Sequence, residues 1–94
     1  MKIDVTDSVQ TLTFGKTQRP VLQNLGDDAV FVLHGPVGGG DPVAEGFRVA
    51  AGESMVWDEP MWDVGGPRLR IACDAEGAAD LRVFPTPESV DTDI

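Results

Sequence analysis

The chain has 94 residues and a formal net charge of −9 at pH 7, from 16 Asp and Glu against seven Lys and Arg. This length fits one small domain with a thin core, because a chain of this size buries only about 60–65% of its unfolded surface. The acidic balance argues against a nucleic-acid partner, since such domains carry a basic patch. No apolar run approaches the ~18 residues of a membrane span. The single Cys73 cannot form an internal disulfide, so we expect no nucleic acid, no membrane and no disulfide.

Short β-strands are the predicted elements, because 11 Gly and seven Pro punctuate the chain and apolar residues alternate with polar ones between them. The alternation starts at residues 3–5 and continues at 9–13. Residues 1–15 are therefore expected as two short strands, one bent strand or an N-terminal arm. Pro20 cannot donate to a sheet ladder, so the extended segment 19–25 suits a strand start or a sheet edge.

The most apolar run, Val-Phe-Val-Leu at residues 30–33, is the predicted centre of the core. The compact turn at 26–29 indicates a hairpin between this run and the preceding extended segment. A second hairpin is predicted from the strands at 46–49 and 54–57, where Gly52 supplies a positive φ in a four-residue loop.

The segment 35–42 holds four Gly and two Pro and predicts a surface loop. A phosphate-binding loop of the Walker type needs a Lys followed by Ser or Thr after its last glycine. Here Asp-Pro follows Gly40 instead, which argues against phosphate binding. Two interpretations stay open, a flexible loop tip or a loop in which Gly38, Gly39 and Gly40 order against a neighbouring subunit.

The last two predicted strands, residues 68–73 and 80–84, alternate clearly between apolar and polar side chains. Residues 85–94 carry two Pro and three acids, so we expect a tail, flexible or held by a partner, after a single β domain at 1–84. About seven or eight short strands predict a small antiparallel β-sandwich or barrel with minimal helix. Alternation assigns the core between two sheets to Phe31, Leu33, Phe47, Val49, Leu69, Ile71, Leu81 and Val83.

The sequence contains few residues in patterns typical of catalytic or metal-binding sites. His34 is the only histidine and sits at a strand end, where a hydrogen-bonding or solvent-facing role outweighs catalysis. Cys73 lies on a face expected to be buried, and no Ser has a nucleophile-elbow context. One Cys and one His argue against zinc, and Ca²⁺ at Asp27, Asp28 and Asp41 is a weaker interpretation than solvated turn acids. The sequence therefore predicts no enzyme, no metal and no cofactor.

Two tryptophans, Trp57 and Trp62, flank a Pro-containing turn with Met61 beside them. Both indoles can fit a core, but Trp and Met are also typical anchors of protein interfaces. A thin sandwich has few deep sites for an indole ring. We therefore expect at least one of these side chains to face a partner.

Three of the seven cations lie close in the sequence. Arg68 and Arg70 share one face of a predicted strand, and Arg82 of a neighbouring strand is positioned to join them. They are either solvated side chains that balance nearby acids or a small basic patch that docks onto an acidic surface. The full set of predicted contact residues is Trp57, Trp62, Met61, Gly38, Gly39, Gly40, Ile3, Val5, Arg68 and Arg70.

Two stretches carry a resemblance to a known class of proteins. Val-Leu-Gln-Asn-Leu-Gly at 21–26, followed by a turn and an apolar strand, and Gly-Phe-Arg-Val-Ala-Ala-Gly-Glu-Ser at 46–54 resemble, in order and spacing, small virion proteins of tailed bacteriophages. The resemblance covers residues 20–84. It departs at 31–35, where relatives commonly place Tyr and Gly, and at 61–64, where the aromatic strand differs.

The resemblance implies a β-sandwich virion component, foremost a capsid decoration protein that stabilises a tailed-phage head by bridging capsomers. Such a protein is made in the host cytoplasm and is present in many copies or as a homo-oligomer on the virion. Its partner is then the major capsid protein or another virion protein. The alternatives are a tail or head–tail connector accessory protein and, from a different class, a free carbohydrate- or protein-binding β-sandwich module.

Overall fold

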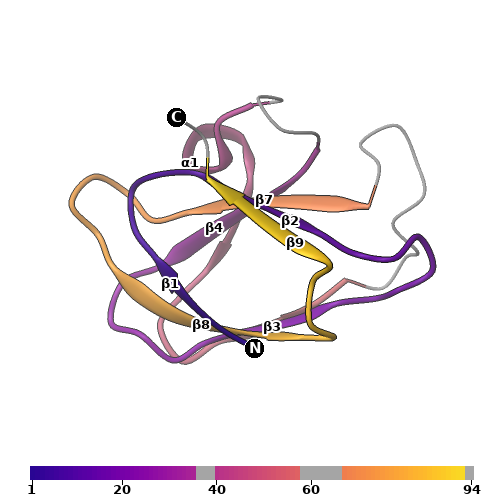
Figure 1. Ribbon diagram of the computed structural model, residues 1–94. Helices are drawn as coiled ribbons and strands as arrows, with labels where there is room; N and C mark the ends of the chain where they lie inside the picture. The colour runs from indigo at the N-terminus through magenta and orange to yellow at the C-terminus, as the bar shows by residue number, and fades with distance from the viewer. Residues whose placement is uncertain (36–39, 58–66, 93–94) are drawn as a thin grey trace.

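Two antiparallel β-sheets form the computed structural model of the chain, which describes residues 1–35, 40–57 and 67–92 (Figure 1). Sheet A contains, in spatial order, β1 (Lys2–Val5), β8 (Ala79–Phe84), β3 (Val21–Asn24) and β6 (Ser54–Val56). Sheet B contains, in spatial order, β5 (Phe47–Val49), β4 (Val30–His34), β7 (Arg68–Ala72), β2 (Gln10–Thr13) and β9 (Ser89–Thr92). The helix in these ranges, α1 (Pro42–Glu45), is one turn, and no helix there is long and apolar enough to span a membrane. The predicted all-β class is confirmed, with nine described strands.

The chain crosses from one sheet to the other at every connection between described strands except the one from β4 to β5. Strands β1-β8-β3-β6 face β2-β7-β4-β5, which is the strand order of a jelly roll built from two Greek keys. β9 extends sheet B beyond β2. This topology contradicts both predicted hairpins, because β3 pairs with β6 and β8 whereas β4 pairs with β5 and β7. The turns after β3 and β5 carry the chain across to the opposite sheet.

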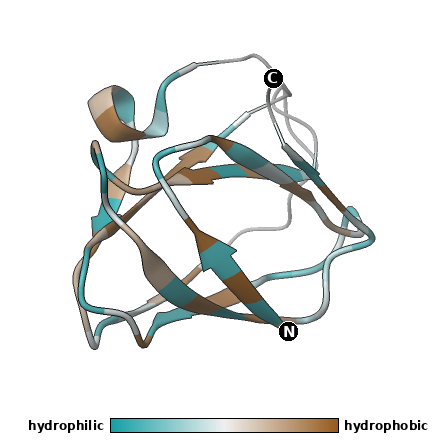
Figure 2. Ribbon diagram, turned by 60° about the vertical axis from the view of Figure 1, so that its left-hand side comes forward, coloured by the Kyte–Doolittle hydropathy of each residue, from teal (hydrophilic) through white to brown (hydrophobic). Residues whose placement is uncertain are grey.

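Alternation places one face of most strands in the core between the sheets. In β1, β3 and β8 every second residue is buried, and Figure 2 shows the hydrophobic and hydrophilic bands along the strand that starts at the N-terminus. The core therefore follows directly from the period of two in these strands. Five predicted core residues are confirmed as buried, and three further large side chains join them: Val49, Leu69, Ile71, Leu81 and Val83, with Leu12, Phe14 and Leu22.

β4 faces the core with the opposite residues from those predicted. Val30 and Val32 are fully buried, whereas Phe31 and Leu33 are half-buried. A run of four apolar residues carries no alternation, so its sequence cannot indicate which side chains point inward. The prediction for Phe47 is also wrong, since its side chain is 64% exposed. β5 is a three-residue strand at the edge of sheet B, and no described strand covers its far side.

Both ends of the described chain are strands of the sandwich. β1 pairs with β8, and β9 pairs with β2. The predicted tail at 85–94 is corrected for residues 89–92, which belong to sheet B. Val90 packs against the core, so this segment has an apolar side chain to bury as well as a ladder to join.

Candidate functional site

The structure divides the predicted contact residues into several groups. The prediction for Ile3 and Val5 is corrected, because both side chains are buried in the core. The alternation Lys-Ile-Asp-Val turns the apolar pair inward and leaves Lys2 and Asp4 outside. Loss of β1 would remove two core side chains, so we assign this strand a role in the stability of the fold. Four other predicted contact residues lie outside the described residues: Gly38, Gly39, Met61 and Trp62.

Arg70 and Gly40, both predicted partner contacts, bind each other. Arg70 Nε donates to Gly40 O at 2.9 Å, and its Nη1 lies 3.5 Å from Thr11 Oγ1. The side chain is buried, with 4% of its surface exposed. The part of the β4–β5 connection that starts at Gly40 therefore lies over the outer face of sheet B. Arg70 serves this intramolecular contact and is not a surface cation.

The predicted basic patch does not form, because β7 belongs to sheet B and β8 to sheet A. Arg68 is half-buried in β7, whereas Arg82 projects from β8 and pairs with Asp80, with Nε and Oδ1 3.1 Å apart. The hydrogen bond from Arg82, together with its charge, lowers the pKa of the Asp80 carboxyl. The same hydrogen bond raises the pKa of the Arg82 guanidinium. These two charges thus satisfy each other.

Trp57 lies at one end of the space between the sheets. Its backbone N–H donates to Pro20 O at 2.9 Å, and its half-buried side chain packs against the core. The indole meets the His34 ring edge to face, with centroids 5.3 Å apart and planes at 65°. His34 therefore has an aromatic partner at the end of β4. Part of the Trp57 side chain packs inside, which shows a core role, and part stays accessible, so its contact with a partner stays a prediction.

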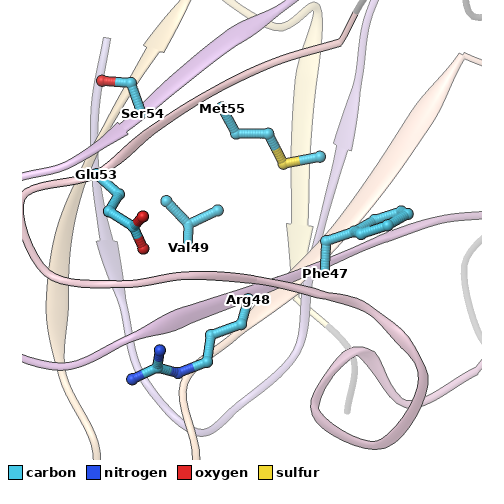
Figure 3. Close-up of a pocket in the computed structure, with 6 residues that line it drawn as sticks. All are labelled: Phe47, Arg48, Val49, Glu53, Ser54 and Met55. Carbon is cyan, nitrogen blue, oxygen red and sulfur yellow. The ribbon is translucent and has the colours of Figure 1, made fainter.

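A cleft of about 230 Å³ opens between the edge strands β5 and β6 (Figure 3). Val49 and Met55 line its floor, where β5 of sheet B and β6 of sheet A approach each other. The Phe47 ring stands at one end, and the Glu53 carboxylate at the other. Arg48 and Ser54 complete the lining of the cleft. We call this feature the β5–β6 cleft.

The β5–β6 cleft combines an apolar floor with an exposed aromatic ring. Its floor is apolar, and Phe47 adds an aromatic ring that is 64% exposed. Glu53 Oε1 accepts a hydrogen bond from Ala50 N at 2.9 Å, so this carboxylate is engaged in the turn. Sequence reasoning missed the cleft because Phe47 alternates in phase with the buried Val49. The brevity of the strand after Gly46 was the only available signal of an edge.

A second apolar surface lies on the outer face of sheet A. Phe84, Val21 and Val56 occupy neighbouring positions on β8, β3 and β6, since Val21 pairs with both of the others in the ladder. They are 74%, 37% and 57% exposed, respectively. We call these three residues the outer apolar row. Alternation alone indicates the outward direction of each residue, but their adjacency depends on the strand order.

The Asn-Leu-Gly stretch at the end of β3 has a structural explanation. The Asn24 side chain is fully buried and donates to Asp28 O at 2.8 Å and to Val49 O at 3.0 Å. Its Oδ1 accepts from Gly26 N at 2.9 Å. A Cβ atom on Gly26 would lie 2.6 Å from Ala79 Cα, which only glycine avoids. These residues build the crossing from sheet A to sheet B.

The described residues contain no group of three or more His, Cys, Asp or Glu placed to hold a metal ion. Two of the candidate Ca²⁺ ligands have backbone partners. Asp41 Oδ1 accepts from Val43 N at 3.0 Å at the start of α1, and Asp28 Oδ2 accepts from Ala78 N at 2.9 Å. Cys73 is buried, and desolvation, followed by nearby carboxylates, raises the pKa of its thiol. Asp41 and Asp28 thus hold neighbouring backbone N–H groups, and Cys73 lies inside the core.

Comparison with known proteins gives no family for the chain, because no protein-family model matches it and no curated protein or solved structure matches it significantly. The surfaces themselves are therefore the basis for assigning a function. The β5–β6 cleft and the outer apolar row are the two exposed apolar surfaces described above.

Proposed function

We propose that this chain is a structural virion protein, specifically a capsid decoration protein of a tailed bacteriophage, which attaches to the head through the β5–β6 cleft. The observation that carries the proposal is the exposed Phe47 ring beside the apolar floor of that cleft. Aromatic side chains next to apolar pockets are typical anchors of protein interfaces. The resemblance over residues 20–84 supplies the class of partner.

The position of the cleft supports attachment to a large assembly. It lies at the edges of both sheets, so a partner reaches it without disturbing the core. Trp57 follows β6 on the same alternating face as Met55, which extends the aromatic and sulfur-containing surface along the strand. The fold adds support by analogy only, because jelly rolls occur in viral capsid proteins and in lectins.

The test is binding to capsid shells of the phage that encodes the chain, assembled without it. The parent chain should co-sediment with the shells in many copies. Phe47→Ala should lower the bound fraction at least about fivefold, the effect of losing an interface anchor worth more than ~1 kcal/mol. Thr92→Ala is the control, because it truncates an exposed side chain on β9, at the edge of sheet B opposite β5.

Failure of the parent chain to bind shells would overturn the proposal. Binding to purified tails or connectors instead would support the accessory-protein alternative. A positive glycan array would support a free binding module, and its loss with a chelator would indicate Ca²⁺. Equal loss of shell binding in Phe47→Ala and Thr92→Ala would show that the β5–β6 cleft is not the specific contact.

A further inference from the structure

The outer face of sheet A differs in charge from the rest of this acidic chain. Two cationic side chains project from it, Lys2 on β1 and Arg82 on β8, and each pairs with a carboxylate of its own strand. Lys2 Nζ lies 3.7 Å from Asp4 Oδ1, and Arg82 binds Asp80. The strand side chains of this face therefore carry no net charge, in a chain of net charge −9; the N-terminal ammonium of Met1 lies beside them and donates to Val83 O at 2.8 Å.

The half of this face formed by β3 and β6 carries no charge at all. Val21 and Gln23 project from β3, and Ser54 and Val56 project from β6. Leu25 follows β3 on the same side by alternation and is 50% exposed. An uncharged, partly apolar surface is unusual on a chain in which 24% of residues are charged.

We propose that a second copy of this chain packs on this face, about a two-fold axis that runs along β3. The ladder fixes two rows across the strands, Phe84–Val21–Val56 and Arg82–Gln23–Ser54. Rotation about β3 exchanges the positions of β8 and β6 between the copies. Phe84 of each copy then meets Val56 of the other, and Val21 meets its own counterpart.

The second row is equally compatible with itself under this rotation. Arg82 of one copy faces the neutral Ser54 of the other, so no like charges oppose each other. Gln23 faces Gln23, and two amides exchange hydrogen bonds because each has donors and an acceptor. Lys2 and Asp4 on β1 fall outside the overlap and stay solvated. Such self-complementarity is what an isologous dimer requires.

The contact is small, so we expect weak association that is populated only at high protein concentration. The three overlapping strands, at ~4.8 Å spacing, give a contact about 10–15 Å across, whose area is below the ~800 Å² per partner of a standard interface. Each copy spans 31 × 25 × 20 Å and carries nine net negative charges. At low salt the ~30 Å Debye length lets these charges repel across the dimer. Added salt should therefore strengthen the association.

The experiment uses the purified chain alone, so its outcome is independent of the virion proposal. Sedimentation equilibrium over a concentration series should show mass rising from 10.0 kDa toward twice that value, more strongly at high salt. Gln23→Glu and Gln23→Lys should each weaken association at least about tenfold, because like charges then face each other on the axis. An equal mixture of the two variants should restore it. Thr92→Glu, exposed on β9 of sheet B, should behave as the parent.

Each alternative outcome overturns the proposal. A constant mass of 10.0 kDa up to the solubility limit would show that no second copy binds. Association that survives Gln23→Glu, or that the mixture of the two Gln23 variants does not restore, would place the contact elsewhere. Circular dichroism of each variant verifies that the fold is retained. A dilution series followed by backbone amide NMR shifts gives a second readout, in which β3, β6 and Phe84 should move and β9 should not.

Discussion

Replacement of the buried Asn24 tests how the chain crosses between its sheets. Asn24→Ala removes three hydrogen bonds from a side chain that has no exposed surface. Of the groups left behind, Val49 O is the most deeply buried, and an unsatisfied buried group costs about 1–3 kcal/mol. With the smaller loss at Asp28 O and Gly26 N, we expect a total loss of about 3 kcal/mol in the free energy of unfolding. A domain of this length has only about 5–14 kcal/mol in all.

Urea unfolding at low micromolar concentration, followed by circular dichroism, measures this loss. The midpoint should fall by about 2–3 M, given slopes near 1–1.5 kcal/mol/M for small domains. Gln23→Ala is the matched control, since it shortens an amide on the adjacent, outward-facing position and should cost less than about 0.5 kcal/mol. A loss below ~1 kcal/mol at Asn24, or equal losses at both positions, would refute the view that this amide organises the turn.

Three further predictions follow from burial and charge. Leu69→Ala should lower the free energy of unfolding by about 2–5 kcal/mol, whereas Phe31→Ala should lower it by less than ~2 kcal/mol, as measured by urea unfolding. A larger loss for Phe31→Ala than for Leu69→Ala would indicate that Phe31, as predicted from the sequence, points into the core. The Cys73 thiol, buried and with a raised pKa, should resist alkylation in the native state and react fully in guanidinium, and rapid native labelling would contradict its burial. NMR titration should place the pKa of Asp80 below the usual Asp range, and Arg82→Ala should return it to that range. Because the pKa is lowered in the folded state, the ion pair stabilises the fold at pH values above the unfolded-state pKa. That stabilisation is lost as the pH falls through the folded-state pKa.

The all-β class was predictable because strand alternation and turn residues are local signals. The buried faces of β7 and β8 followed from the same period of two, and Leu69, Ile71, Leu81 and Val83 are buried as predicted. Alternation fails where a strand is uniformly apolar, as at residues 30–33, or where it ends at a sheet edge, as at Phe47. In both cases neighbouring strands decide the burial.

Strand pairing was not predictable from turns. The turns after β3 and β5 look like hairpin loops, and Gly52 does adopt the expected positive φ of 80°. The signal that β3 crosses to the other sheet lies in Asn24, whose amide reaches Val49 O 25 residues away. The contact of Arg70 with Gly40 is likewise set by the path of the β4–β5 connection. The two apolar surfaces depend on strand order, so only the structure could assemble them.

The order of strands in sheet A has a consequence for how the chain acquires its structure during synthesis. β8 lies between β1 and β3 and pairs with both, so β1 has no described sheet partner until residues 79–84 have been made. β2 likewise has no described sheet partner until β7 has been made, and its second partner is β9. Topologies dominated by such distant pairings fold slowly, on millisecond to second timescales. In a chain still being synthesised, most core side chains of this domain would therefore stay exposed until β8 has emerged from the ribosome, and the domain would fold in a single late step.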